Sequence, residues 1–289
     1  MDNREWKGKS RGGAVGNLIF VLMIKYLGVR CAYILLLLIV PYFVIFAPKA
    51  TAAMWDFYHR RLKYNILKSA ISIPFHFYRF GQVLIDKTAM AMGLADRYSF
   101  DFENYDKFLE ILNSDKGAMV IGAHIGNWEC GAPFFGKYGK KMNIVMLEAE
   151  HEKIKKVFEE NSHSVGYKII PLGNDIISSM IEIKCALNNN EYVCMQGDRF
   201  MNQAEGGSAH TITRKFIGHD ALFPQGPFML AKKLKVPTVF YFALRNGHKK
   251  YMFRFTPAGE GDLADQYVAL LERTVMEYPS QWFNFYKFW

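Results

Sequence analysis

The segment 122–129, GAHIGNWE, holds the residues best suited to chemistry. His124 follows a short apolar stretch that predicts a buried strand, and ligands of open α/β sheets gather where strands end. If a helix begins near Gly126, Glu129 falls in its first turn and can fold back toward His124. A carboxylate so placed fixes the imidazole tautomer and stabilises the cation formed when the ring accepts a proton. The pair suits activation of a hydroxyl for attack on an acyl thioester, and a structural histidine is the alternative.

Covalent catalysis and metal chemistry find less support in the sequence. It has no GxSxG motif, and Cys130 has no partnering base in view. It also lacks HExxH and any clustered Cys and His residues, so no metal site is predicted. The cysteines are scattered without a CxxC spacing, which favours reduced thiols and a cytoplasmic catalytic part. They are Cys31, Cys130, Cys185 and Cys194.

Beyond residue 100 the pattern alternates between apolar strand-like stretches and helical ones. Strands are predicted at 117–122, 143–147, 167–171, 191–196, 238–244 and 251–256. Helices are predicted to end near 108–114 and to cover 150–163, 176–187, 227–234 and 262–277. This alternation predicts an α/β fold with a mixed, largely parallel sheet flanked by helices. A Gly/Ser/Thr-rich loop over 206–218, with His210 inside it and His219 just after it, is a candidate substrate lid, although ordinary surface histidines are the simpler interpretation.

The net charge of +9 lies entirely in the first hundred residues. Residues 1–100 contain 14 Lys and Arg against 5 Asp and Glu, whereas residues 101–289 contain 22 of each. Basic residues that flank apolar segments are attracted to an anionic bilayer. No basic helix, zinc spacing or RNP-like motif accompanies the charge, so we expect a membrane surface as partner and no nucleic acid.

Two uncharged apolar runs lie in this basic region, at 12–24 and 31–47. The second approaches the length of a spanning helix, and Pro41 in its middle should kink or break that helix. We interpret the runs as a membrane anchor, either one short span or a shallow helical hairpin, with a buried core helix as the alternative. The mixed helical pattern at 54–93 fits interfacial helices or ordinary packing helices equally well. We therefore divide the chain into a membrane-anchoring, interfacial helical region, 1–100, and a catalytic domain, 101–289.

Four motifs in order resemble one protein family. HIGNWE is similar to the H-x4-(D/E) signature of the lysophospholipid acyltransferase superfamily, and its NWE ending resembles the branch of lipid A late acyltransferases. MQGDRF at 195–200 resembles the (D/G)-D-(R/H) segment of that branch. FPQGPFMLAKKLKVPTVFY at 223–241 and YPSQWFNFYKFW at 278–289 resemble its later motifs. The hydrophobic N-terminal region agrees as well.

The resemblance implies roles for the residues at the matching positions. It implies that His124 is the general base and that Glu129 orients it. It places Asp198 and Arg199 at the same pocket, where the planar fork of Arg199 suits a phosphate or an oxyanion. A structural ion pair between these two is the alternative. Asn127 is expected to shape the turn at the substrate-binding site.

The resemblance also implies substrates and a location. The expected reaction moves a fatty acyl chain from acyl carrier protein or coenzyme A, with no cofactor, to a hydroxyl of a membrane glycolipid such as a lipid A precursor of lipopolysaccharide. The expected location is the bacterial inner membrane, with the catalytic part on its cytoplasmic face. Transfer to an aminolipid or a polyene pigment, hydrolysis, and a non-catalytic membrane scaffold are the alternatives.

Overall fold

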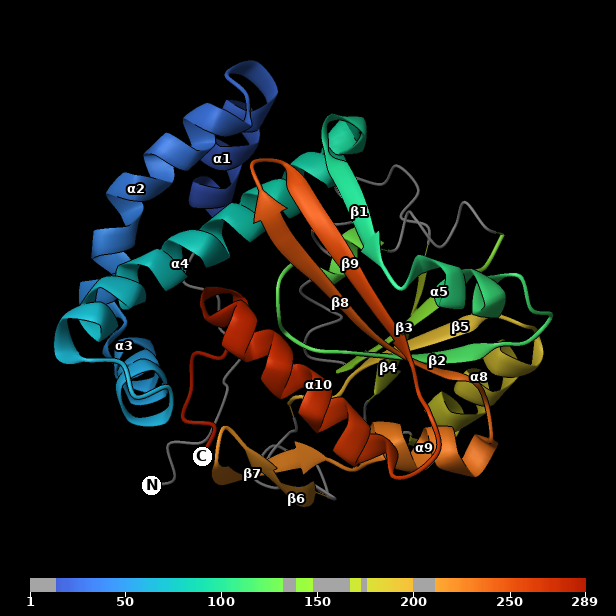
Figure 1. Ribbon diagram of the computed structural model, residues 1–289. Coiled ribbons are helices and arrows are strands. Elements are labelled where there is room, and N and C mark those ends of the chain that lie inside the picture. Colours follow the sequence, from blue (N-terminus) through green and yellow to red (C-terminus); the bar gives the residue numbers. More distant parts are fainter. Residues whose placement is uncertain (1–13, 132–138, 148–166, 173–175, 200–210) are drawn as a thin grey trace.

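The computed structural model describes residues 14–131, 139–147, 167–172, 176–199 and 211–289 (Figure 1). Its centre is a seven-stranded sheet in the order β1-β9-β8-β2-β5-β3-β4. Five of these strands run parallel to one another, while β9 pairs antiparallel with β8 and β1 runs parallel to β9. The strands are β1 Ser99–Glu103, β2 Ala118–Gly122, β3 Met142–Leu147, β4 Tyr167–Leu172, β5 Tyr192–Gln196, β8 Thr238–Gly247 and β9 Lys250–Pro257. The predicted α/β class and the largely parallel sheet are confirmed.

The helices that follow residue 100 cover this sheet, as expected for strands buried on both faces. They are α5 Tyr105–Leu112, α8 Ile176–Asn188, α9 Gly226–Leu234 and α10 Leu263–Glu277. The α10 helix lies beside β8 and β9 (Figure 1) and packs Tyr267 against Phe240 of β8, with 5.7 Å between ring centroids. The α5 helix stacks Phe108 on Phe255. Each of these helices coincides closely with a predicted one, whereas the helix predicted at 150–163 lies outside the described residues.

A layer of helices from the first hundred residues lies beside the sheet (Figure 1). It contains α1 Ala14–Tyr26, α2 Val29–Phe46, α3 Pro48–Trp55, a π-helical turn Asp56–Arg61, and α4 Ile66–Ala89. The α1 and α2 helices are joined through Leu27 and Gly28 and form a helical hairpin, one of the two arrangements predicted for these apolar runs. Its role as a membrane anchor stays a prediction. The predicted helical character of this region is confirmed.

Pro41 lies inside α2, and the helix neither breaks nor ends there. A proline removes only one helical hydrogen bond, and the buried side chains Leu36 and Val40 hold the preceding turn in place. Leu36 covers Gly81 of α4, where an added methyl group would come within 2.5 Å of the leucine side chain. Tight packing of α2 on α4 therefore keeps the helix continuous.

Within the described part of the chain, α2 is the one helix long and apolar enough to cross a membrane. Only 28% of it is buried, which argues against the alternative of a core helix. Its exposed apolar side chains include Ile34, Leu37, Leu38 and Ile45. An apolar surface of this kind is typical of a helix that contacts lipid or a partner.

Two strand features were not predicted. The loop predicted at 206–218 is wrong for its second half, because β6 Thr211–Phe216 and β7 His219–Pro224 form an antiparallel hairpin. A lid function for this segment stays a prediction. The two-residue turn of the hairpin, Ile217–Gly218, has φ angles of 50° and 75°, which suit the right-handed twist of a hairpin. His219 begins β7, and His210 lies outside the described residues.

The other missed strand, β1 at Ser99–Glu103, spans the domain boundary predicted at residue 100. It pairs with β9 along its whole length. One hydrophobic core also joins residues from both sides of the boundary, including Leu36 of α2 and Phe253 of β9. The division into two regions stays a prediction.

Candidate active site

Two neighbouring parallel strands deliver the central residues of the site to one edge of the sheet. His124 follows β2, and Asp198 follows β5, with Gly122 opposite Gln196 in the register of the pair. The chain turn after β5 is tied to β2 because the Gly197 N–H donates to the Gly122 carbonyl oxygen at 2.9 Å. This is the carboxyl edge, where α/β sheets collect ligands.

The Asp198 carboxylate holds His124 at two points. One oxygen, Oδ2, accepts the His124 backbone N–H at 2.9 Å, and Oδ1 lies 2.8 Å from the ring Nδ1. The aspartate side chain is 1% exposed, whereas the histidine side chain is 23% exposed. An ionised Asp198 requires the proton on Nδ1, so Nε2 carries the lone pair. The histidine is therefore oriented by a buried acid and accessible to solvent.

Charge around Asp198 keeps this acid ionised. Burial is the largest single influence and raises its pKa, but the charge and hydrogen bonds of His124, together with the positive charge of Arg199, outweigh it. The net result is a pKa below the ordinary value for an aspartate. A fixed anion beside the ring stabilises the imidazolium that forms when Nε2 accepts a proton.

The C-terminal segment supports the loop that carries His124. The Phe283 N–H donates to the His124 carbonyl oxygen at 2.9 Å, and the Gly126 N–H donates to the Gln281 carbonyl oxygen at 2.9 Å. The Gln281 side chain in turn exchanges hydrogen bonds with the backbone of Arg245 on β8. The P-x-Q-W ending therefore positions the site by backbone pairing.

The backbone conformation and the close packing at position 126 both require a glycine. Its φ angle is +63°, and an added methyl group would lie 1.9 Å from the Ala243 carbonyl oxygen of β8. The adjacent Asn127 N–H donates to that same oxygen at 2.7 Å. A side chain at position 126 would therefore push the loop away from β8.

Glu129 lies in a 3₁₀ turn, Trp128–Gly131, rather than in the first turn of a longer helix. Its carboxylate forms an ion pair with the ammonium group of Lys87 on α4. Among the described contacts it makes no hydrogen bond to His124. The structure thus brings His124 together with Asp198 and holds Glu129 on the helical layer.

The remaining predicted residues surround this pair. Asn127 is buried, and its Nδ2 atom has no hydrogen-bond partner within the described residues. Arg199 donates to the Phe283 carbonyl oxygen, and its guanidinium carbon lies 5.9 Å from the centre of the Tyr286 ring. Both residues therefore lie beside the loop that carries His124.

Cys130 is an unsuitable nucleophile. It is buried, and burial together with the charges of Asp86 and Glu129 raises the pKa of its thiol well above the usual value. A thiol that stays protonated does not attack an acyl group.

Sequence reasoning missed three residues that position the site. Tyr267 of α10 donates its hydroxyl to the Gly122 carbonyl oxygen at 2.8 Å. Lys87 and Gln281 hold Glu129 and the His124 loop, as described above. Gln281 belongs to the P-x-Q-W motif, which could have identified it, whereas Lys87 and Tyr267 lie in helices outside the four motifs.

The chain matches the family described as bacterial lipid A biosynthesis acyltransferase over residues 70–289. It is 23% identical over 175 residues to a phosphatidylinositol mannoside acyltransferase of Mycobacterium tuberculosis strain H37Rv, which covers 57% of this chain and 52% of that protein. It is 21% identical over 188 residues to a protein of the same name from Mycolicibacterium smegmatis, which covers 63% of this chain and 60% of that one. The match thus spans little more than half the length of these curated relatives. Because the family match takes in most of the chain and includes all four motifs, the protein belongs to the bacterial lipid A biosynthesis acyltransferase family.

Proposed function

We propose that the protein is an acyltransferase that moves a fatty acyl chain from a thioester to a hydroxyl of a membrane glycolipid. The observation that supports it most strongly is the pairing of His124 with buried Asp198 at the carboxyl edge of the sheet. This pair, in a chain of the lipid A acyltransferase family, is suited to general-base chemistry on a hydroxyl.

The proposed step uses His124 as a proton carrier. Nε2 removes the proton of the acceptor hydroxyl while the oxygen attacks the thioester carbonyl carbon. The carbon–oxygen bond forms, the carbon–sulfur bond breaks, and the leaving thiolate takes the proton back from the imidazolium. Asp198 keeps the ring in the required tautomer and stabilises its cation between the two proton transfers. Arg199, whose fork suits phosphate or oxyanion groups, is the proposed anion-binding residue of the site, and Asn127 lines it.

Two carboxylates compete for the role of orienting acid. The contacts favour Asp198, which touches both the ring and the backbone of His124. Glu129 remains the acid that the family motif implies, and its ion pair with Lys87 fixes the turn that follows His124. The roles are separable by substitution, because only the acid at Nδ1 controls the tautomer.

The proposed acceptor is a lipid A precursor, following the family description, and the donor is acyl carrier protein or coenzyme A. The relatives named for phosphatidylinositol mannoside support a glycolipid acceptor more broadly. The apolar α1–α2 hairpin and the basic first hundred residues support action at a membrane. The cytoplasmic face of the inner membrane is the proposed location, following the family resemblance.

Mass spectrometry of lipids tests this proposal. A deletion strain is complemented with the parent chain or with the His124→Ala variant at equal expression. The parent should add one acyl mass to one glycolipid class, and His124→Ala should not. An added acyl mass on an aminolipid or a polyene pigment would name a different acceptor and reject the glycolipid. Full restoration by His124→Ala would indicate a scaffold.

A further inference from the structure

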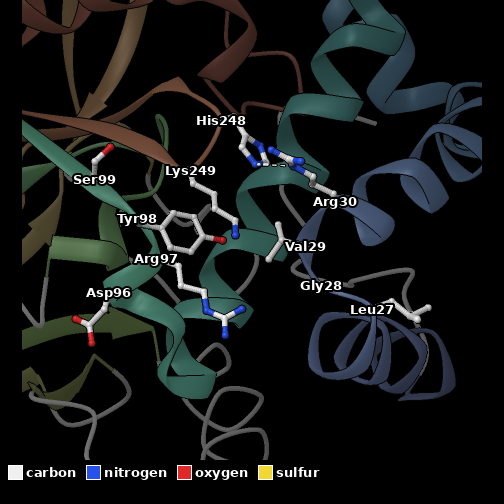
Figure 2. A pocket seen from close by; sticks show the side chains of 10 residues that line it. All are labelled: Leu27, Gly28, Val29, Arg30, Asp96, Arg97, Tyr98, Ser99, His248 and Lys249. Atoms are coloured by element: carbon white, nitrogen blue, oxygen red, sulfur yellow. Dashed lines mark hydrogen bonds between the residues drawn. The ribbon is translucent and has the colours of Figure 1, made fainter.

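A pocket lies at the turn between α1 and α2, and His124 does not line it. It has a volume of about 580 Å³, within the range of ligand pockets. None of the residues assigned above to the active site lines it. Figure 2 shows its side chains, which come from the helical hairpin, the segment before β1, and the β8–β9 turn. The residues used below are Leu27, Arg30, Arg97, Tyr98, His248 and Lys249.

The lining carries an excess of positive charge. The pocket lining contains three permanent cations, Arg30, Arg97 and Lys249, and one acid, Asp96. None of these three cations forms an ion pair within the part of the chain that the structure describes. Burial and the nearby charges of Arg30, Lys249 and Arg245 hold the pKa of His248 below its usual value. The pocket is therefore a place where an anion would be stabilised.

The base of the pocket is rigid. Tyr98 is buried, and its hydroxyl donates to Asp86 of α4 at 2.8 Å. The same carboxylate accepts from Tyr251 at 2.6 Å and from Arg245 at 3.1 Å. The floor beneath the pocket's cations is therefore fixed by buried hydrogen bonds, while Arg30 and Arg97 themselves are exposed and reachable by a ligand.

Apolar surface adjoins the cations. Leu27 lines the pocket and is 64% exposed, and neighbouring Tyr26 is 70% exposed. Arginine forks match phosphate oxygens, and adjacent exposed apolar side chains match acyl chains. A phospholipid has both features in one molecule, whereas inorganic phosphate has only the first.

The pocket and the active site both lie beyond the carboxyl ends of parallel strands of the sheet. The β8 strand ends at Gly247, before the turn that bears His248 and Lys249, and the parallel β2 strand ends at Gly122, before His124. A bridge between Gly126 and Ala243 ties the His124 loop to β8, the strand that leads to the pocket. A lipid bound in the pocket would therefore face the membrane together with the carboxyl edge of the sheet.

We propose that this pocket binds the phosphate of an anionic membrane lipid and thereby seats the His124 edge of the sheet on the bilayer. The proposal deepens the proposed function but does not depend on catalysis by His124. A His124→Ala variant should bind vesicles as the parent does, so failure of one claim is distinguishable from failure of the other.

Vesicle binding by the full chain tests the proposal. Phosphatidylcholine vesicles with and without phosphatidylglycerol are compared for the parent and for two triple variants of equal charge. The pocket variant is Arg30→Gln, Arg97→Gln and Lys249→Gln; the control is Lys25→Gln, Lys49→Gln and Lys63→Gln, all exposed in the same helical region. The pocket variant should lose at least about tenfold more affinity for anionic vesicles than the control.

Equal losses in the two variants would mean diffuse attraction and would overturn the site. If the triple variant fails to fold, Arg97→Gln alone must weaken anionic binding more than Lys25→Gln does. A soluble short-chain phosphatidic acid should bind the parent at least about tenfold more tightly than inorganic phosphate does. Equal affinity for the two would make this a free-anion site and reject the lipid.

Discussion

Two motif residues, Glu129 and Asp198, each have a carboxylate that could orient His124. In the structure these carboxylates contact different residues. Asp198 is buried against the ring Nδ1, while Glu129 is paired with Lys87. A buried acid at Nδ1 fixes the tautomer that leaves the lone pair on Nε2 and offers a counter-charge to an imidazolium. We therefore expect the proposed chemistry to depend on Asp198 more than on Glu129.

We expect Asp198→Asn to lower turnover by about 10²–10⁴-fold, because the amide neither fixes the tautomer nor stabilises the imidazolium. Glu129→Gln is the matched control, with the same loss of one carboxylate charge in the turn that follows His124, and should cost less than about tenfold. Steady-state kinetics on both variants measure the difference. A near-normal Asp198→Asn beside a severely impaired Glu129→Gln would restore the His124–Glu129 dyad.

The lowered pKa of Asp198 has a consequence for stability. A carboxyl whose pKa is lower in the folded than in the unfolded chain stabilises the fold when ionised. Its contribution is complete above the ordinary pKa and is lost as the pH falls through the folded value. The free energy of unfolding of the parent, measured relative to Asp198→Asn in urea, should therefore fall below about pH 4. A difference that stays constant down to about pH 2.5 would show that Asp198 is not ionically stabilised.

At the scale of elements, three segments form the site: the turn after β2, the residues that follow β5, and the C-terminal segment from Gln281 onward. Backbone pairing of Gly126 with Gln281, and of His124 with Phe283, holds the loop that carries His124 between β8 and the C-terminal segment. This explains why the motif HIGNWE and the ending P-x-Q-W occur in one chain.

Gly126→Ala should therefore disturb the loop. The added methyl group would clash with the Ala243 carbonyl oxygen, and the φ angle of +63° is unfavourable for alanine. We therefore expect destabilisation by about 1–3 kcal/mol and a loss of activity. Gly226→Ala in the first turn of α9 is the control, because nothing lies within 4 Å of its added methyl group. Thermal melts compare the two. Equal melting temperatures would contradict the close approach of the loop to β8.

Most elements were predictable because apolar periodicity marks them. The buried strands β2 and β5 are short apolar runs, and α10 has a clear helical pattern. The edge strand β1 alternates serine and acidic residues with phenylalanine, a weaker signal. The β6–β7 turn uses Ile217–Gly218 instead of the usual Asn-Gly.

The partner of His124 was harder to predict for a different reason. Asp198 is 74 residues from His124, and their contact depends on β2 and β5 being neighbours in the sheet. Strand order is a property of the whole fold and leaves no local mark. Glu129, close in sequence, was the easier inference.

At the scale of the whole molecule, the helical layer and the sheet are joined by a buried polar cluster around Asp86. Its carboxylate accepts from Tyr98, Tyr251 and Arg245, and the Tyr33 hydroxyl of α2 also donates to it. The helices of the first hundred residues and the sheet therefore share one interior.

Asp86→Ala should destabilise the protein by about 3–5 kcal/mol, because it leaves the buried Arg245 guanidinium without its carboxylate. Asp220→Ala is the control: that residue pairs with Lys215 in the β6–β7 hairpin, and both side chains are largely exposed, so its loss should cost about 1 kcal/mol or less. Urea unfolding measures both. A small effect of Asp86→Ala would mean that the two regions are joined mainly by apolar packing.

The central claim is that His124 activates a lipid hydroxyl for attack on an acyl thioester. Its most direct measurement is single-turnover transfer of a labelled acyl group from a thioester donor to a glycolipid, with the full-length parent and His124→Ala on the same vesicles. We expect labelled glycolipid from the parent and a rate lower by about 10²–10⁴-fold from folded His124→Ala. An unchanged rate in His124→Ala, or labelled free fatty acid in place of labelled glycolipid from the parent, would contradict it.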